Sequence, residues 1–91
     1  MTPSIRNPQS AIQVVLYGKP GCHLCEDAKK EIEAARRERD FILTEVDVSI
    51  DPGLHRDYGE RIPVIEVNGE EAFELGVERT ALLRHLGTVA P

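Results

Sequence analysis

The order of structural signals near the N-terminus constrains the fold of this chain more than any other feature. Residues 11–18, AIQVVLYG, form an apolar, β-branched run with the length of a strand covered on both faces. From Cys22 to about Arg39 the pattern is helical, with apolar residues spaced four, four and three apart on one face: Leu24, Ala28, Ile32 and Ala35. Residues 41–49, FILTEVDVS, predict a second strand. A strand, a helix and a strand in this order predict a parallel pair joined by a right-handed crossover.

The second half of the chain predicts a short helix and an antiparallel hairpin. Asp51 stands in a good N-cap position at the start of DPGLHRDYG (51–59), which predicts the short helix. Residues 63–67 and 70–75 have strand character and flank Asn68-Gly69, a strong signal for a two-residue hairpin turn. The fourth strand is the more polar of the two, so we expect it to be more exposed.

The last predicted helix covers residues 77–86 and is stopped by Gly87. Its apolar side carries three leucines, Leu82, Leu83 and Leu86. The complete order is β-α-β-α-β-β-α, which predicts a single α/β domain over residues 11–88 with one mixed sheet. The polar residues 1–10, which include two prolines, predict a loosely held N-terminal tail.

The composition fits a soluble domain and argues against several classes of partner. The net charge of −5 disfavours nucleic acids and anionic membrane surfaces, because both require clustered basic residues. The N-terminal ten residues hold no apolar run of the kind found in secretory signals and membrane anchors. Two cysteines are too few for a secreted disulfide framework. We therefore expect a cytoplasmic monomer whose thiols are kept reduced.

Both cysteines, Cys22 and Cys25, lie at the start of the first predicted helix. Residues three apart on a helix share a face, so the two sulfur atoms can approach bonding distance. The unpaired N–H groups and the helix dipole favour a thiolate at Cys22, and such a setting can lower a thiol pKa of roughly 8.5 to about 3.5–7.5. Lys19 and a protonated His23 would add positive charge, whereas Glu26 opposes the thiolate. Cys22, nearer the helix end, is the expected nucleophile, and the deeper Cys25 is the expected resolving cysteine.

Other interpretations of the cysteine pair compete with redox chemistry. A zinc site within one chain would need two more ligands, and the three histidines show no ligand spacing. A metal or iron–sulfur cluster shared by two copies of the chain would need only four thiolates, two from each copy. Inert core cysteines fit poorly with the irregular, exposed turn that Gly18, Pro20 and Gly21 predict. A non-catalytic adaptor that uses the fold only for recognition is a further hypothesis.

Two motifs in this chain resemble those of glutaredoxins and thioredoxins. VVLYGKPGCHLC (14–25) resembles their first strand and active-site turn, and RIPVIEVNGE (61–70) resembles their cis-proline segment and the hairpin that follows. The element order matches from about Ala11 to Leu86. The chain length and the Lys-x-x-Cys-x-x-Cys arrangement are most similar to compact bacterial glutaredoxin-like proteins. The resemblance implies a thioredoxin-like, glutaredoxin-type fold whose four-stranded mixed sheet carries helices on both faces.

The resemblance also implies an activity. The protein would be a dithiol–disulfide oxidoreductase that exchanges Cys22 and Cys25 with disulfides of proteins or small molecules. Its electrons would come from a reductase or from glutathione. Pro63 matches the cis-proline opposite the cysteines, and Ile62 matches the residue whose backbone pairs with a bound peptide or glutathione.

Three further residues have weaker counterparts in these families. Lys19 matches a lysine that holds a glutathione carboxylate. His23 replaces a proline or glycine that usually follows the first cysteine, and Tyr17 precedes the active-site turn. His23 and Tyr17 are therefore candidates for residues that tune the redox potential.

The chain departs from glutathione-using glutaredoxins between the hairpin and the last helix. Those proteins carry a Gly-Gly pair there, followed by an acidic residue. Here Phe73 and Glu74 stand at about the positions of the glycines, and Gly76 is single. Four acids in this region would repel a negatively charged tripeptide: Glu70, Glu71, Glu74 and Glu78. We therefore expect no bound cofactor and little use of glutathione.

Overall fold

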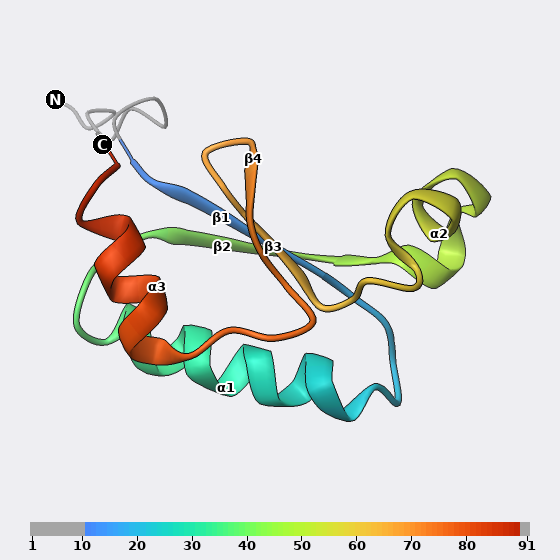
Figure 1. The fold of residues 1–91 in the computed structure, drawn as a ribbon, viewed down its shortest axis with the longest axis horizontal. Helices are drawn as coiled ribbons and strands as arrows, with labels where there is room; N and C mark the ends of the chain where they lie inside the picture. Colours follow the sequence, from blue (N-terminus) through green and yellow to red (C-terminus); the bar gives the residue numbers. More distant parts are fainter. Residues whose placement is uncertain (1–10, 90–91) are drawn as a thin grey trace, which may run out of the picture.

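The structure is a computed structural model of the 91-residue chain, and it describes residues 11–89. The helices and strands follow the predicted order (Figure 1). They are β1 Gln13–Gly18, α1 His23–Arg36, β2 Ile42–Asp47, the 3-10 helix η3 Val48–Ile50, α2 Pro52–Tyr58, β3 Val64–Val67, β4 Glu70–Glu74 and α3 Arg79–Leu86. The predicted tail, residues 1–10, lies outside the described residues.

The four strands form one mixed sheet in the order β2-β1-β3-β4. β1 and β2 are parallel and are joined through α1, whereas β3 runs antiparallel to both β1 and β4. The Asn68-Gly69 turn joins β3 to β4, and both residues have the positive φ angles that such a turn requires. The predicted α/β class, crossover and hairpin are thereby confirmed.

Helices α1 and α3 cover one face of the sheet, while α2 lies at one end of the strands (Figure 1). The main core lies between that face and the two helices. Its fully buried members include Val14, Ile32, Ile65, Leu82 and Leu86. Because side chains alternate along a strand, Tyr17 points to the opposite face. The ring of Tyr58 in α2 stacks on the Tyr17 ring with centroids 4.2 Å apart, so helices do contact both faces, but α2 covers only one end.

The buried face of α1 differs from the sequence prediction at its first turn. Leu24, which we expected on that face, is 52% exposed, and Cys25 is buried instead. The buried residues follow spacings of three, four and three: Cys25, Ala28, Ile32 and Ala35. Such a stripe fits a helix as well as one that begins at Leu24, so periodicity alone does not separate the two. The helix also ends at Arg36, about one turn earlier than predicted.

Candidate active site

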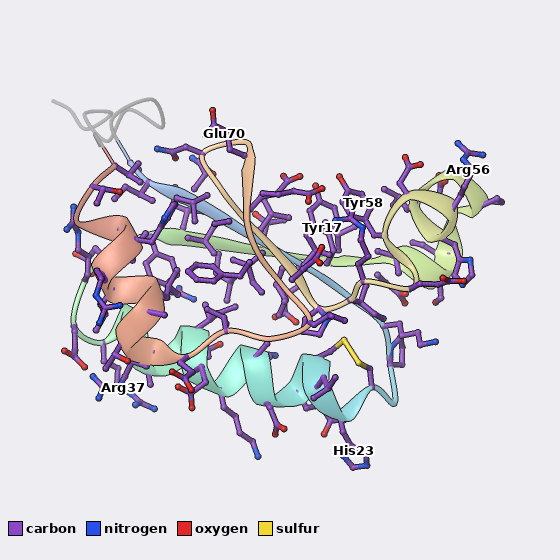
Figure 2. All side chains as sticks on the ribbon, in the orientation of Figure 1. Tyr17, His23, Arg37, Arg56, Tyr58 and Glu70 are labelled. Carbon is purple, nitrogen blue, oxygen red and sulfur yellow. A yellow bond between two sulfur atoms is a disulfide. The ribbon has the colours of Figure 1, made fainter. Side chains whose placement is uncertain are left out.

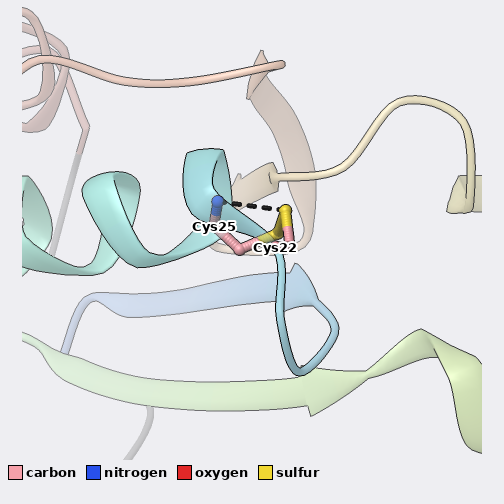
Figure 3. The surroundings of a disulfide bond; sticks show 2 residues. All are labelled: Cys22 and Cys25. Carbon is pink, nitrogen blue, oxygen red and sulfur yellow. Dashed lines mark hydrogen bonds between the residues drawn. A yellow bond between two sulfur atoms is a disulfide. The ribbon is translucent and has the colours of Figure 1, made fainter.

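Cys22 and Cys25 form a disulfide across the first turn of α1 (Figure 3). Their Cα atoms are 5.2 Å apart, within the usual range for a disulfide. Cys22 is the N-cap residue of the helix, and its Sγ atom accepts a hydrogen bond from the Cys25 N–H at 3.2 Å. The sulfur thus partners one of the helix N–H groups that have no acceptor within the helix.

The two cysteines differ in exposure. Cys25 is only 7% exposed and belongs to a small apolar cluster with Val48 and Ile62. Cys22 packs against the edge of this cluster and is partly open to solvent. The pair therefore has an outer and an inner sulfur atom, as the position of each residue on the helix predicts.

Gly18 provides the space for the inner cysteine. It is the last residue of β1, and a Cβ atom there would lie 3.0 Å from Cys25 Sγ and 3.2 Å from Cys25 Cβ. The sequence pattern places Gly18 only in the predicted turn before the helix. The available signal was a glycine at the end of a buried strand, which often marks the close approach of another group. Gly21, with φ at +77°, then lets the turn lead into α1.

The Ile62–Pro63 peptide bond is cis, as the resemblance implies. The segment that leads into β3 passes the cysteine pair (Figure 3), and the Ile62 side chain packs in the cluster that holds Cys25. Pro63 is fully buried. Within residues 11–89, no hydrogen bond involves the N–H or the C=O of Ile62. A backbone donor and acceptor therefore stand free near the sulfur atoms.

Two other predicted residues lie at the periphery of the site. Lys19 is exposed in the turn and makes no ion pair with any residue in the described range 11–89. His23 is the first residue of α1, and its side chain points into solvent, away from the sheet and the disulfide (Figure 2). The structure thus brings Ile62 and Pro63 to the cysteines but leaves His23 outside the cluster.

A cleft of about 360 Å³ lies between the turn at 18–21, the start of α1 and the end of β2, and Cys25 lines it. Charged residues of both signs surround it: Lys19, Glu26, Lys29, Glu45 and Asp47. Lys29 pairs with Glu45 at 3.2 Å. The hydroxyl and N–H of Ser49 donate to Asp47 and hold the pKa of that carboxyl below its usual value. The cleft therefore has no concentrated positive charge that would select an anion.

Tyr17 belongs to a hydrogen-bonded cluster that attaches α2 to the sheet. The hydroxyls of Tyr17 and Tyr58 donate to the two carboxylate oxygens of Glu66 at 3.1 and 3.3 Å. Burial, together with the neighbouring Glu66 carboxylate, raises the pKa of Tyr17 well above its ordinary value, so the phenol stays neutral. Since α2 contains no buried residue, this cluster is a principal attachment of the helix.

Arg61 connects α2 with β4 and carries no recognisable signal in the sequence. Its guanidinium donates to Glu71 at 2.8 Å, to Glu74 at 3.1 Å and to the Asp57 carbonyl at 3.0 Å. Arg61 lowers the pKa of Glu71, and the carboxylates, Glu71 first, raise the pKa of Arg61. These ion pairs hold two of the acids that we expected to repel glutathione, and one guanidinium with two carboxylates keeps one net negative charge. A third, Glu70, lies at the hairpin turn, far from the disulfide (Figure 2).

The glycine-like backbone follows β4 at Leu75 and Gly76, where φ is +65° and +148°. The expectation that Phe73 and Glu74 occupy these positions is wrong. Phe73 pairs with Ile65 within the sheet and packs against the main core. A β-bulge between Ile65 and Glu66 shifts the register of β4, and counting residues from the hairpin turn does not reveal it.

Within residues 11–89, no group of three or more His, Cys, Asp or Glu side chains is placed to hold a metal ion. In the same range, no helix has the length and apolar character needed to cross a membrane.

Residues 13–87 match the sequence profile of the glutaredoxin-like domain family (DUF836). The chain belongs to this family. The matched range includes Cys22, Cys25, Ile62 and Pro63, so it covers the whole site described above. A pair of cysteines at disulfide distance in a glutaredoxin-like domain is consistent with redox function.

This glutaredoxin-like chain is similar to uncharacterized proteins of mycobacteria. Uncharacterized protein Rv0508 of Mycobacterium tuberculosis (strain ATCC 25618 / H37Rv) is 30% identical over 64 residues, which are 65% of this chain and 66% of that protein. Uncharacterized protein Mb0520 of Mycobacterium bovis gives the same values. The match thus spans slightly less than two thirds of either relative.

Solved structures establish the thioredoxin fold. Protein XcR50 from X. campestris has a TM-score of 0.73 at 27% identity, over 84% of this chain and 97% of its own. Protein Ne2328 from Nitrosomonas europaea has a TM-score of 0.71 at 23% identity, over 82% and 91% of the two chains. Chloroplastic thioredoxin z has a TM-score of 0.73 at 16% identity, over 88% and 79%. The last two likenesses concern the fold alone.

Proposed function

We propose that this glutaredoxin-like protein is a thiol–disulfide oxidoreductase that uses Cys22 and Cys25 as a reversible dithiol. The observation that carries the proposal is the asymmetry of the pair. Cys22 caps α1 and is partly exposed, while Cys25 is buried one turn behind it and at bonding distance. The helix N–H groups that the Cys22 sulfur faces favour its thiolate form, which is the attacking species.

The exchange proceeds in two steps. In the first step, the Cys22 thiolate attacks a substrate disulfide R–S–S–R′. A bond forms between Cys22 Sγ and the R sulfur, and R′–S⁻ leaves and takes up a proton. In the second step, Cys25 loses its proton and attacks Cys22 Sγ, which forms the intramolecular disulfide and releases R–S⁻ to be protonated. Two electrons and two protons pass from the dithiol to the substrate, and an external thiol reductant reverses these steps.

The segment at Ile62 and Pro63 is the proposed binding edge for the substrate. The free N–H and C=O of Ile62 can pair with an extended peptide next to its cysteine, in the manner of an added β-strand. Lys19, exposed beside the turn, is available to a carboxylate on the substrate. We place this activity in the cytoplasm, where a reductase or another thiol can regenerate the dithiol.

The proposal is tested by turnover and by the reduction potential. The purified chain should reduce hydroxyethyl disulfide catalytically when a thiol reductant is supplied, and Cys22→Ser should abolish turnover. Equilibration with graded glutathione buffers should give one two-electron potential for the pair, which separates a reductant near −270 mV from an oxidant near −120 mV. Turnover that survives in Cys22→Ser would contradict the proposal. A visible chromophore or stoichiometric metal in freshly purified protein would support a shared metal or cluster site instead.

A further inference from the structure

Leu75 combines two features that rarely occur together. Its φ of +65° lies in the left-handed region, which disfavours every residue with a Cβ atom relative to glycine. Its side chain is nevertheless 54% exposed and belongs to neither apolar cluster. Its N–H donates to the Pro63 carbonyl at 2.7 Å and to the Arg61 carbonyl at 3.2 Å, bonds that a glycine would make equally well. Neither packing nor the turn itself explains a leucine at this position, and such outliers persist mainly at functional sites.

Leu75 is hydrogen-bonded to the segment that passes the cysteine pair. The N–H of Leu75 donates to the carbonyl of Pro63. Ile62, which precedes Pro63, packs in the cluster that holds Cys25. Leu24, which is 52% exposed, lies between the two cysteines in α1. One exposed leucine therefore lies in the first turn of α1, and the other is hydrogen-bonded to the segment that carries Pro63.

The charges around Leu75 favour an apolar contact. The nearest acidic residue along the chain, Glu74, is paired with Arg61, as is Glu71. The next residue, Gly76, has no side chain that could shield Leu75 from a bound molecule. A substrate atom that approaches Leu75 thus meets hydrocarbon beside carboxylates that are held by Arg61.

We propose that Leu75 is a specificity-determining residue that contacts an apolar side chain next to the attacked cysteine of a polypeptide substrate. This inference rests on the proposed disulfide exchange and names the class of substrate that the exchange prefers. Glycine at this position would relax the backbone but would remove the contact. The left-handed leucine is thus retained for recognition and not for stability.

The test compares two peptide homodisulfides that differ only in the residue before the cysteine, leucine or serine. The wild-type chain should show a kcat/KM about fivefold higher for the leucine peptide, the gain expected when about half of a leucine side chain is buried. Leu75→Gly and Leu75→Asn should bring the ratio close to one, and Leu75→Met should preserve it. Ile42→Ala removes an apolar side chain that is 43% exposed at the far end of β2, so it should leave the ratio unchanged.

Turnover of hydroxyethyl disulfide separates this inference from the proposed function. If the wild-type chain fails to reduce it, the proposed function fails, and this inference fails with it. If it is reduced while the two peptides have equal kcat/KM, or while Leu75→Gly keeps the preference, only the inference is overturned. The thermal midpoint of Leu75→Gly should equal or exceed that of the wild type. A lower midpoint would assign the side chain to packing and would also overturn the inference.

Discussion

A Cβ atom on Gly18 would lie 3.0 Å from the Sγ atom of Cys25, tighter than nine in ten Cβ contacts in proteins, so the sulfur would have to shift by a few tenths of an ångström. The end of β1 therefore fixes the depth at which the inner cysteine can sit. The glycine that ends the first strand and the disulfide that follows it form one packing unit. The chemistry of the pair thus depends on a residue that has no reactive group.

Gly18→Ala should destabilise the oxidised protein by about 1–3 kcal/mol, because the Cys25 sulfur is buried and has to move. A reduced Cys25 side chain can rotate away, so the reduction potential should rise by roughly 20–60 mV, at 30 mV per 1.4 kcal/mol. Chemical denaturation and equilibration with glutathione buffers measure the two effects. Gly87→Ala is the control, since the nearest atom to a Cβ there is 3.4 Å away. Equal potentials for Gly18→Ala and the wild type would contradict this packing argument.

Most of the fold could be predicted from the sequence because its signals are local. The Asn68-Gly69 turn and the Asp51 cap each act within a few positions, and both are found where predicted. The CxxC motif at a strand-to-helix junction likewise located the disulfide. The cis bond before Pro63 followed only from family resemblance, because an X–Pro bond is trans in most contexts.

The errors arise where the outcome depends on contacts distant in sequence. Whether Leu24 or Cys25 faces the core depends on how α1 is rotated against the sheet, which its own periodicity leaves open. The left-handed position at Leu75 depends on a bulge in β4. Arg61 is paired across ten and thirteen residues with acids that looked unpaired in the sequence.

The rotation of α1 predicts different outcomes for two apolar positions on the helix. Leu24→Ala should change the free energy of unfolding by no more than about 0.5 kcal/mol, as is usual for surface positions. Ile32→Ala should cost about 2–5 kcal/mol, because Ile32 is fully buried between the sheet and α3. Urea denaturation of the reduced proteins measures both changes. A large loss for Leu24→Ala would mean that the helix is rotated toward the face predicted from the sequence.

The attachment of α2 depends on the ring of Tyr58. Tyr58→Ala removes the stack on Tyr17 and should cost about 1–2 kcal/mol, while Tyr58→Phe keeps the stack and loses only the bond to Glu66, worth about 1 kcal/mol. Amide hydrogen exchange in residues 52–58 should accelerate strongly in Tyr58→Ala and only slightly in Tyr58→Phe. Equal acceleration in both variants would show that the hydrogen bond, and not the stack, holds the helix.

The Arg61–Glu71 pair predicts a dependence of stability on pH. Arg61 lowers the pKa of Glu71 below its ordinary value of 4.5. A carboxyl with a depressed pKa in the folded state stabilises the fold above the unfolded pKa, and this stabilisation is lost as pH falls through the folded pKa. The thermal midpoint of the wild type should therefore exceed that of Glu71→Gln near pH 7, and the difference should shrink as the pH falls below 4.5 and through the depressed pKa of Glu71.

Glu70→Gln is the matched control for this pH dependence. Glu70 lies one residue away at the hairpin turn and has no ion pair within residues 11–89. The thermal midpoint of Glu70→Gln should equal that of the wild type at every pH. A difference between the wild type and Glu71→Gln that stays constant with pH would rule out a charge interaction with Arg61.

The central claim is that Cys22 attacks and Cys25 resolves, and trapping tests it most directly. Each single variant, Cys25→Ser and Cys22→Ser, is reduced and then mixed with hydroxyethyl disulfide or a peptide disulfide. The products are analysed by intact mass and peptide mapping. We predict that Cys25→Ser accumulates a stable mixed disulfide at Cys22, whereas Cys22→Ser, whose remaining thiol is 7% exposed in the oxidised chain, reacts far more slowly. Equal or faster labelling of Cys25 in Cys22→Ser would contradict the account.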